Sequence, residues 1–242
     1  LWRLHTVLAA AVFAGSLVLL IAWSALEMRI DNPLVDVRLL RRPTIAAANL
    51  AMLTGGVGMY LLLSLITRYL QTLAVAGYGF GLDTFQAGLA LVPFSLLGFA
   101  AGKLTPRLGT LLAHDLLAAS TAVVLLAFVL FAVARVDLAE PVVALGVLGF
   151  GVGAFSAAMP AVILAATPKE ETASTMSVNQ VVRSIGFSIG SALAGLILAA
   201  YTTGRFPQQA GYTAAAWTGA AIAVVTLLIV ASQPRLARRD TT

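Results

Sequence analysis

Long apolar stretches separated by short polar segments form the dominant pattern along this chain. An α-helix rises about 1.5 Å per residue, so roughly 20 apolar residues are needed to cross about 30 Å of hydrocarbon. The apolar positions do not alternate with polar ones in the period of two that barrel strands require. The pattern therefore predicts an all-α membrane protein with seven transmembrane helices, at roughly 5–26, 44–70, 85–102, 110–134, 141–166, 172–200 and 212–232.

The composition agrees with this class. Apolar residues make up 60% of the 242 residues and charged residues only 10%, whereas soluble domains carry about 25% charged residues. Cysteine is absent, which excludes a disulfide framework, a thiolate nucleophile and a cysteine-based metal site. With no metal-ligand cluster and no paired carboxylates, we expect no metal, no cofactor and no enzymatic activity.

The net charge of +5 is spread over the flanks of the apolar stretches, which argues against nucleic acid as a partner. The set of flanks that holds ten basic residues is cytoplasmic by the positive-inside rule, and the opposite set holds four. This rule places the carboxyl end in the cytoplasm. The excess of Arg and Ala suggests a bacterial source, hence the bacterial inner membrane. The ten are Arg29, Arg38, Arg41, Arg42, Lys103, Arg107, Lys169, Arg235, Arg238 and Arg239; the four are Arg3, Arg68, Arg135 and Arg205.

Residues 43–135 and 141–233 are equal in length, at 93 residues each (135−43+1 and 233−141+1), and each holds three stretches. Three spans reverse the topology, so the two segments are predicted to be inverted repeats. The segment 32–43 is either an amphipathic piece on the cytoplasmic interface or a charged loop. Because the chain opens at Leu1 almost directly into an apolar run, we expect it to begin inside a larger membrane protein.

Four segments, in order along the chain, match known motifs. Residues 27–40 (EMRIDNPLVDVRLL) match an E…PLlDlrLf signature, and 69–93 supply Y-l-Q…G…aG…lP. Residues 102–109 (GKLTPRLG) match a G-x-L-a-D-r-x-G loop, with Pro106 at the acidic position, and 173–186 (ASTMSVNQVVRSIG) match A-s…n…R-x-l-G. In this order and spacing, the chain resembles the fourteen-span drug:proton antiporters of the major facilitator superfamily.

The resemblance implies a division of the chain. Residues 1–28 would be a linker transmembrane helix, 29–42 a cytoplasmic amphipathic connector, 43–233 the six-helix carboxy-terminal bundle and 234–242 a cytoplasmic tail. It further implies the carboxy-terminal half of a proton-coupled multidrug exporter that works by alternating access. Its partners would be amphipathic small-molecule substrates, protons, the lipid bilayer and a missing amino-terminal six-helix half. A non-transporting membrane scaffold or sensor derived from a half-transporter stays open as the alternative.

Arg183 is the most informative candidate residue. It lies eleven residues after Thr172, about 16 Å into its helix at 1.5 Å per residue, where a charge is expensive and usually faces a bundle interior or a watery cavity. Asn179 precedes it by one turn. Either the two form a polar patch on the translocation pathway, or Arg183 clamps the carbonyl groups of a neighbouring helix.

Further pathway candidates lie on the second and fifth stretches, which the resemblance makes the cavity-lining helices: Asn49, Tyr60, Ser64, Gln71, Phe155 and Met159. The pair Gly149 and Gly153 is expected to serve close helix packing. The candidate gating loop comprises Gly102, Arg107 and Gly109, with Asp115 as a conjectural substitute for the missing acid.

The pentapeptide 186–190 matches the G-x-S-x-G of hydrolases, but a continuous apolar helix is the wrong context for a nucleophile elbow. A proton-coupled exporter also needs an acid that ionises and is protonated in turn. The second, third, fifth, sixth and seventh stretches have no carboxylate in their cores, so that acid is expected mainly in the missing half.

Overall fold

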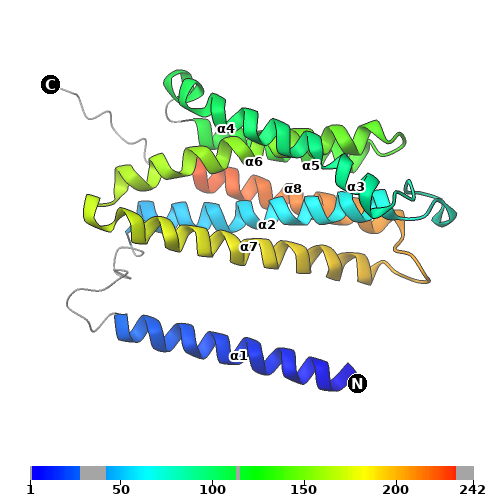
Figure 1. Ribbon diagram of the computed structural model, residues 1–242, viewed down its shortest axis with the longest axis horizontal. Coiled ribbons are helices and arrows are strands. Elements are labelled where there is room, and N and C mark those ends of the chain that lie inside the picture. Colours follow the sequence, from blue (N-terminus) through cyan, green and yellow to red (C-terminus); the bar gives the residue numbers. More distant parts are fainter. Residues whose placement is uncertain (1, 28–41, 113–114, 233–242) are drawn as a thin grey trace.

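The computed structural model describes residues 2–27, 42–112 and 115–232 (Figure 1). Their helices are α1 (Trp2–Glu27), α2 (Pro43–Gln71), α3 (Thr84–Ala90), α4 (Val92–Leu112), α5 (Leu116–Val133), α6 (Ala139–Ala166), α7 (Thr172–Ala200) and α8 (Gln209–Ala231). Two short 3₁₀ turns, Ala74–Ala76 and Lys169–Glu171, stand in the connections. Apart from one isolated bridge between Thr202 and Pro207, the described residues contain no strand pairing. The prediction of an all-α fold is confirmed.

Six segments of the described chain are long and apolar enough to cross a membrane: α2, the α3–α4 unit over Thr84–Arg107, α5, α6, α7 and α8. They match the second to seventh predicted stretches. The first stretch is also helical, as α1, and within it Ala14–Trp23 is an apolar segment shorter than the six spans. Nearly all of the expected connector (29–42), and the tail (234–242), lie outside the described residues.

The third span differs from the prediction in two ways. It is broken at Leu91 into α3 and α4, and it continues past residue 102 through Pro106 to Leu112. The expectation of a loop over 102–109 was therefore wrong. A proline removes only its own N–H donor from the ladder and is tolerated in transmembrane helices, where other groups satisfy the freed carbonyl groups. In the preceding turn, the Thr105 Oγ1 donates to the Ala101 carbonyl at 2.9 Å.

The six spans form two layers. Neighbouring helices run in the order α4, α6, α2, α7, and α5 and α8 pack against each other behind α6 and α2 (Figure 1). Exchanging the two 93-residue segments exchanges α2 with α6, α4 with α7 and α5 with α8. This exchange turns the α2–α7 pair into α6–α4 and the α5–α6 pair into α8–α2, which are the pairs in contact. The packing therefore has the form of two inverted repeats.

Burial separates central from peripheral helices. Half of the most apolar window of α2 and of α6 is buried (50% and 56%), against 11% for the α3–α4 unit and 22% for α7. The main core lies among α2, α5, α6 and α8, with Leu61, Phe128, Leu145 and Tyr212 fully buried. The two outer helices of the four-helix layer, α4 and α7, are thus the least buried by the described chain.

Glycines bring the backbones of α4 and α6 into close contact, which we call a seam. A methyl group built on Gly149 or Gly153 of α6 would overlap the carbonyl groups of Phe94 and Gly98 on α4, respectively. Small residues four apart allow helix backbones in a membrane to approach this closely. The packing role expected for the two glycines is confirmed.

Candidate functional site

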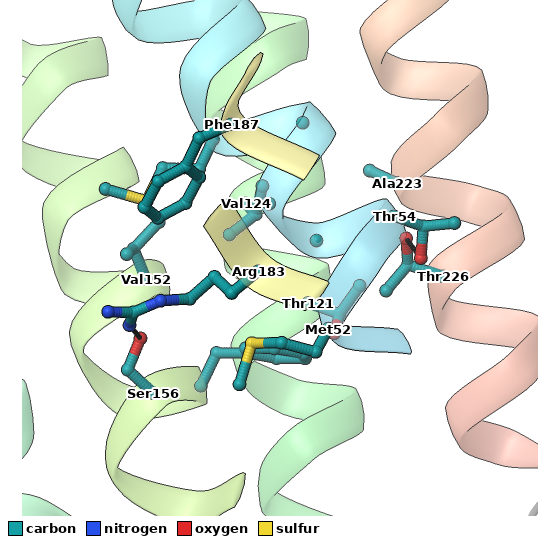
Figure 2. Close-up of a pocket in the computed structure, with 15 residues that line it drawn as sticks. Met52, Thr54, Thr121, Val124, Val152, Ser156, Arg183, Phe187, Ala223 and Thr226 are labelled. Carbon is teal, nitrogen blue, oxygen red and sulfur yellow. Dashed lines mark hydrogen bonds between the residues drawn. The ribbon is translucent and has the colours of Figure 1, made fainter. Parts of the chain in front are cut away.

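A small cavity lies inside the bundle between α2, α6 and α7, with α5 and α8 closing its rear (Figure 2). Its volume is about 30 Å³, room for roughly one water molecule. The wall combines hydroxyl groups, methionines and aromatic rings with one cation. The lining includes Met52, Thr54, Met59, Thr121, Val152, Phe155, Ser156, Arg183, Phe187 and Thr226.

Arg183 supplies the cation, and its contacts are few. Its Nη1 donates to the Ser156 Oγ on α6 at 3.5 Å, the outer limit of a hydrogen bond. Its guanidinium carbon lies 5.3 Å from the centre of the Phe187 ring, a cation–π distance. The Nε is buried and has no hydrogen-bond partner. The Nε–H donor of Arg183 therefore has no acceptor within the described chain.

No carboxylate of the described chain stands at a comparable depth. The acidic side chains all belong to helix ends or connections, at Glu27, Asp83, Asp115, Asp137, Glu140, Glu170 and Glu171. By contrast, Arg183 is eleven residues from the first residue of α7. The positive charge in the cavity wall is thus not matched by an acid from these helices.

Asn49 and Asn179 meet in the seam between α2 and α7. The Asn179 Nδ2 donates to the Asn49 Oδ1 at 2.9 Å, and the Asn179 side chain is only 2% exposed. Two and three turns further along α7, Gly186 and Gly190 pack against the α2 backbone, which a methyl group at either position would overlap. The two predicted pathway residues therefore bond to each other and join the helices.

Tyr60 stands at the boundary between the cavity and a wider groove. Its ring stacks on Phe187 with centres 4.3 Å apart. Phe187 lines both the cavity and a groove of about 590 Å³, whose wall also includes Ser184, Ser188 and Ser191. The cavity and the groove therefore share the Phe187 side chain as a common wall residue.

A second groove section, of about 400 Å³, continues along α2 and α7 past Tyr60, Ser64, Thr67, Arg68 and Gln71. The structure thus brings the predicted Tyr60, Ser64 and Gln71 together. Phe155 lines the inner cavity at 7% exposure, and Met159, at 1%, belongs to the core beside it.

One face of α7 is polar along most of its length. Five exposed residues follow one another at helical steps of three or four: Ser177, Gln180, Ser184, Ser188 and Ser191. The adjoining exposed face carries Val181, Ile185 and Ile189. The polar face was not recognised from the sequence, although this spacing was its signal. Ser188, the nucleophile of the rejected hydrolase motif, donates to the Ser184 carbonyl within the helix.

The gating candidates lie away from the cavity. Gly102, Arg107 and Gly109 belong to α4, and the exposed Asp115 occupies the position before α5. None of them lines the cavity or the grooves beside it. Within the described residues, they form no common site with Arg183.

A second arginine, Arg135, which the sequence marked only as a flank charge, lies where α5 ends and joins the end of α2 to the start of α8. The Arg135 Nη2 donates to the Thr213 Oγ1 at 2.6 Å, and the Tyr69 hydroxyl donates to the Arg135 carbonyl at 3.1 Å. Burial lowers the pKa of the Arg135 guanidinium. Burial, with Tyr212 nearby, also raises the pKa of Tyr78 in the adjoining connection to about 12.

The comparisons with known proteins agree with this architecture. The model of the Major Facilitator Superfamily matches residues 2–191, so the chain belongs to this superfamily of multi-pass membrane transporters and not to an enzyme family. The superfamily part of the resemblance is confirmed. Multidrug resistance protein Stp of Mycobacterium tuberculosis, from strains CDC 1551 / Oshkosh and ATCC 25618 / H37Rv, is 30% identical over 184 residues. These residues are 73% of this chain and 32% of the relative, so the chain spans about a third of the length of the curated relatives it matches.

Proposed function

We propose that this chain is the carboxy-terminal half of a proton-coupled exporter of amphipathic small molecules, and that it works by alternating access. The observation that carries the proposal is the exposed polar face of α7 beside the groove along α2. Gln180 and four serines on a membrane-spanning helix are poorly matched to lipid and well matched to a water-filled pathway. The name of the similar multidrug resistance protein supports the substrate class.

The layer α4–α6–α2–α7 is the surface on which an amino-terminal bundle would pack. Its outer members α4 and α7 are the least buried spans, whereas α5 and α8 cover the other side. Alternating access would then be the rocking of one bundle against the other around the cavity near Arg183. In this arrangement α1 is the second linker helix.

Coupling to protons requires a carboxylate that is absent from the interior of the described spans. We assign that acid to the amino-terminal bundle. The ten-to-four asymmetry of basic residues supports a carboxyl end in the cytoplasm, and the membrane would be the inner membrane of a bacterium. The connector, residues 29–42, would lie on the same side.

Cysteine scanning tests the pathway directly, because these 242 residues contain no cysteine; any cysteine elsewhere in the complete natural protein is first replaced by serine. Single cysteines are introduced into the complete natural protein, one set on the polar face of α7 and one on its apolar face. The polar set (Ser177, Gln180, Ser184, Ser188, Ser191) should react with a charged, water-soluble thiol reagent, and substrate should slow the reaction. The matched apolar set (Val181, Ile185, Ile189) should stay unreactive.

Equal reactivity of the two faces would contradict the assignment of the polar face to the pathway.

The function itself is tested by efflux of a fluorescent amphipathic dye from cells, with and without a proton gradient. Liposomes that hold only this chain should show no proton-driven flux, because half of the pathway is absent. Robust flux there would contradict the half-transporter proposal, and a complete natural protein without any efflux would favour the scaffold or sensor.

A further inference from the structure

The cavity beside Arg183 has a cation and no matching anion in the part of the chain that the structure describes. Its Nε is buried without a partner, and its bond to Ser156 is long, at 3.5 Å. A guanidinium stays charged in proteins, and a charge within a membrane helix normally pairs or faces water. The Arg183 guanidinium can therefore accept a negatively charged group as a partner.

The chemistry of the guanidinium specifies which negative group fits. Its N–H donors form a planar fork that matches the two oxygens of a carboxylate. An anion placed against the Nε edge would satisfy the donor that now lacks a partner. The Ser156 hydroxyl, beside the same head group (Figure 2), offers a further polar contact.

The remainder of the cavity favours an apolar body attached to that carboxylate. Phe155, Met52 and Met59 form much of the wall, and methionine side chains adapt to differently shaped apolar ligands. At about 30 Å³, the cavity is closed to such a ligand until a side chain moves. Phe187 lines both this cavity and the groove of about 590 Å³, so rotation of its ring is the movement that would open one to the other.

We infer that Arg183 and Ser156 bind the carboxylate of amphipathic organic acids, whose apolar body lies against Phe155 and the two methionines. The acid enters from the α2–α7 groove past the stacked rings of Tyr60 and Phe187. This inference rests on the proposed function, since it names the substrate class of the same pathway. A cationic amphipath of the same shape would meet the Arg183 charge and bind weakly.

The test is equilibrium binding to the complete natural protein in nanodiscs of neutral lipid, without a proton gradient. Three probes share one ring system: 1-naphthoate, 1-naphthylmethylammonium and the neutral 1-naphthylmethanol. The unaltered protein should bind the acid about tenfold or more tightly than the amine, since the charge-assisted contact is made only by the acid. Arg183→Gln should abolish this preference, and Ser156→Ala should weaken acid binding several-fold. Arg205→Gln, in an exposed connection, should leave it unchanged.

The comparison of acid with amine in the unaltered protein requires no variant to fold. Equal binding of the two probes would overturn the inference. A preference for the amine would also overturn it, because an acidic side chain from the rest of the protein would then already occupy Arg183. If a well-folded Arg183→Gln protein still prefers the acid, the carboxylate binds at another site, and the inference is overturned. Since binding is read without transport, absent efflux with a clear acid preference would refute the proposed export and leave the site intact.

Discussion

Replacing single glycines of α7 by alanine tests whether the α2–α7 seam is as close as described. A methyl group on Gly190 would lie 3.0 Å from the Leu61 nitrogen and would overlap the Val57 carbonyl oxygen, whereas Gly195 has nothing within 4 Å. Both substitutions replace glycine in the interior of one helix, which by itself favours the helix by about 1 kcal/mol. Overpacking typically costs about 1–3 kcal/mol, and here only Gly190→Ala incurs it.

The propensity gain cancels between the two variants, so Gly190→Ala should be less stable than Gly195→Ala by about 1–3 kcal/mol. At about 2–4 °C per kcal/mol for a chain of this size, thermal unfolding in one detergent should separate them by several degrees. Gly195→Ala should melt at or slightly above the unaltered protein. If both variants unfold at the same temperature, α2 and α7 are less closely packed than the structure shows, and the reasoning from glycine contacts fails.

Three other predictions concern a buried hydroxyl, a tyrosine and the topology. Thr226→Val removes a 2.8 Å hydrogen bond from α8 to Thr54 of α2 and should cost about 0.6 kcal/mol in the same melting assay; an unchanged melt would show the bond to be dispensable. The pKa of Tyr78 is about 12 in the folded protein against about 10 in an unfolded chain, so stability should fall as pH rises from about 10 towards 12, and Tyr78→Phe should make that fall smaller. Cysteines beside Lys103 and Lys169 should resist an impermeant reagent in intact cells, and one beside Arg205 should react; the reverse would invert the proposed topology.

Hydropathy was sufficient to predict the spans, because a helix in lipid satisfies its own backbone and needs only length and apolarity. It failed at Pro106, where a proline marks a loop in water but is accommodated in a membrane helix. Arg183 was found from its depth alone. Its neighbours Ser156 and Phe187 were not linked to it, because Ser156 lies on another helix and the ring contact depends on side-chain direction.

Asn49 and Asn179 illustrate a further limit of the sequence. Each was recognised as polar within an apolar stretch, and both were predicted to line the pathway. Their mutual hydrogen bond depends on the register between α2 and α7, which the glycines of the seam set. The Arg135 cluster was missed for the same reason, since its members come from connections and helix ends far apart in the sequence.

The carbonyl oxygen of Arg183 lies 2.8 Å from the place where a methyl group on Gly56 would stand. Two backbones in such close register cannot slide past each other without collision. The depth of the guanidinium is therefore fixed by the α2 backbone as well as by its own helix. A displacement of α7 along its axis would therefore carry α2 with it, so that the two helices would move as one unit.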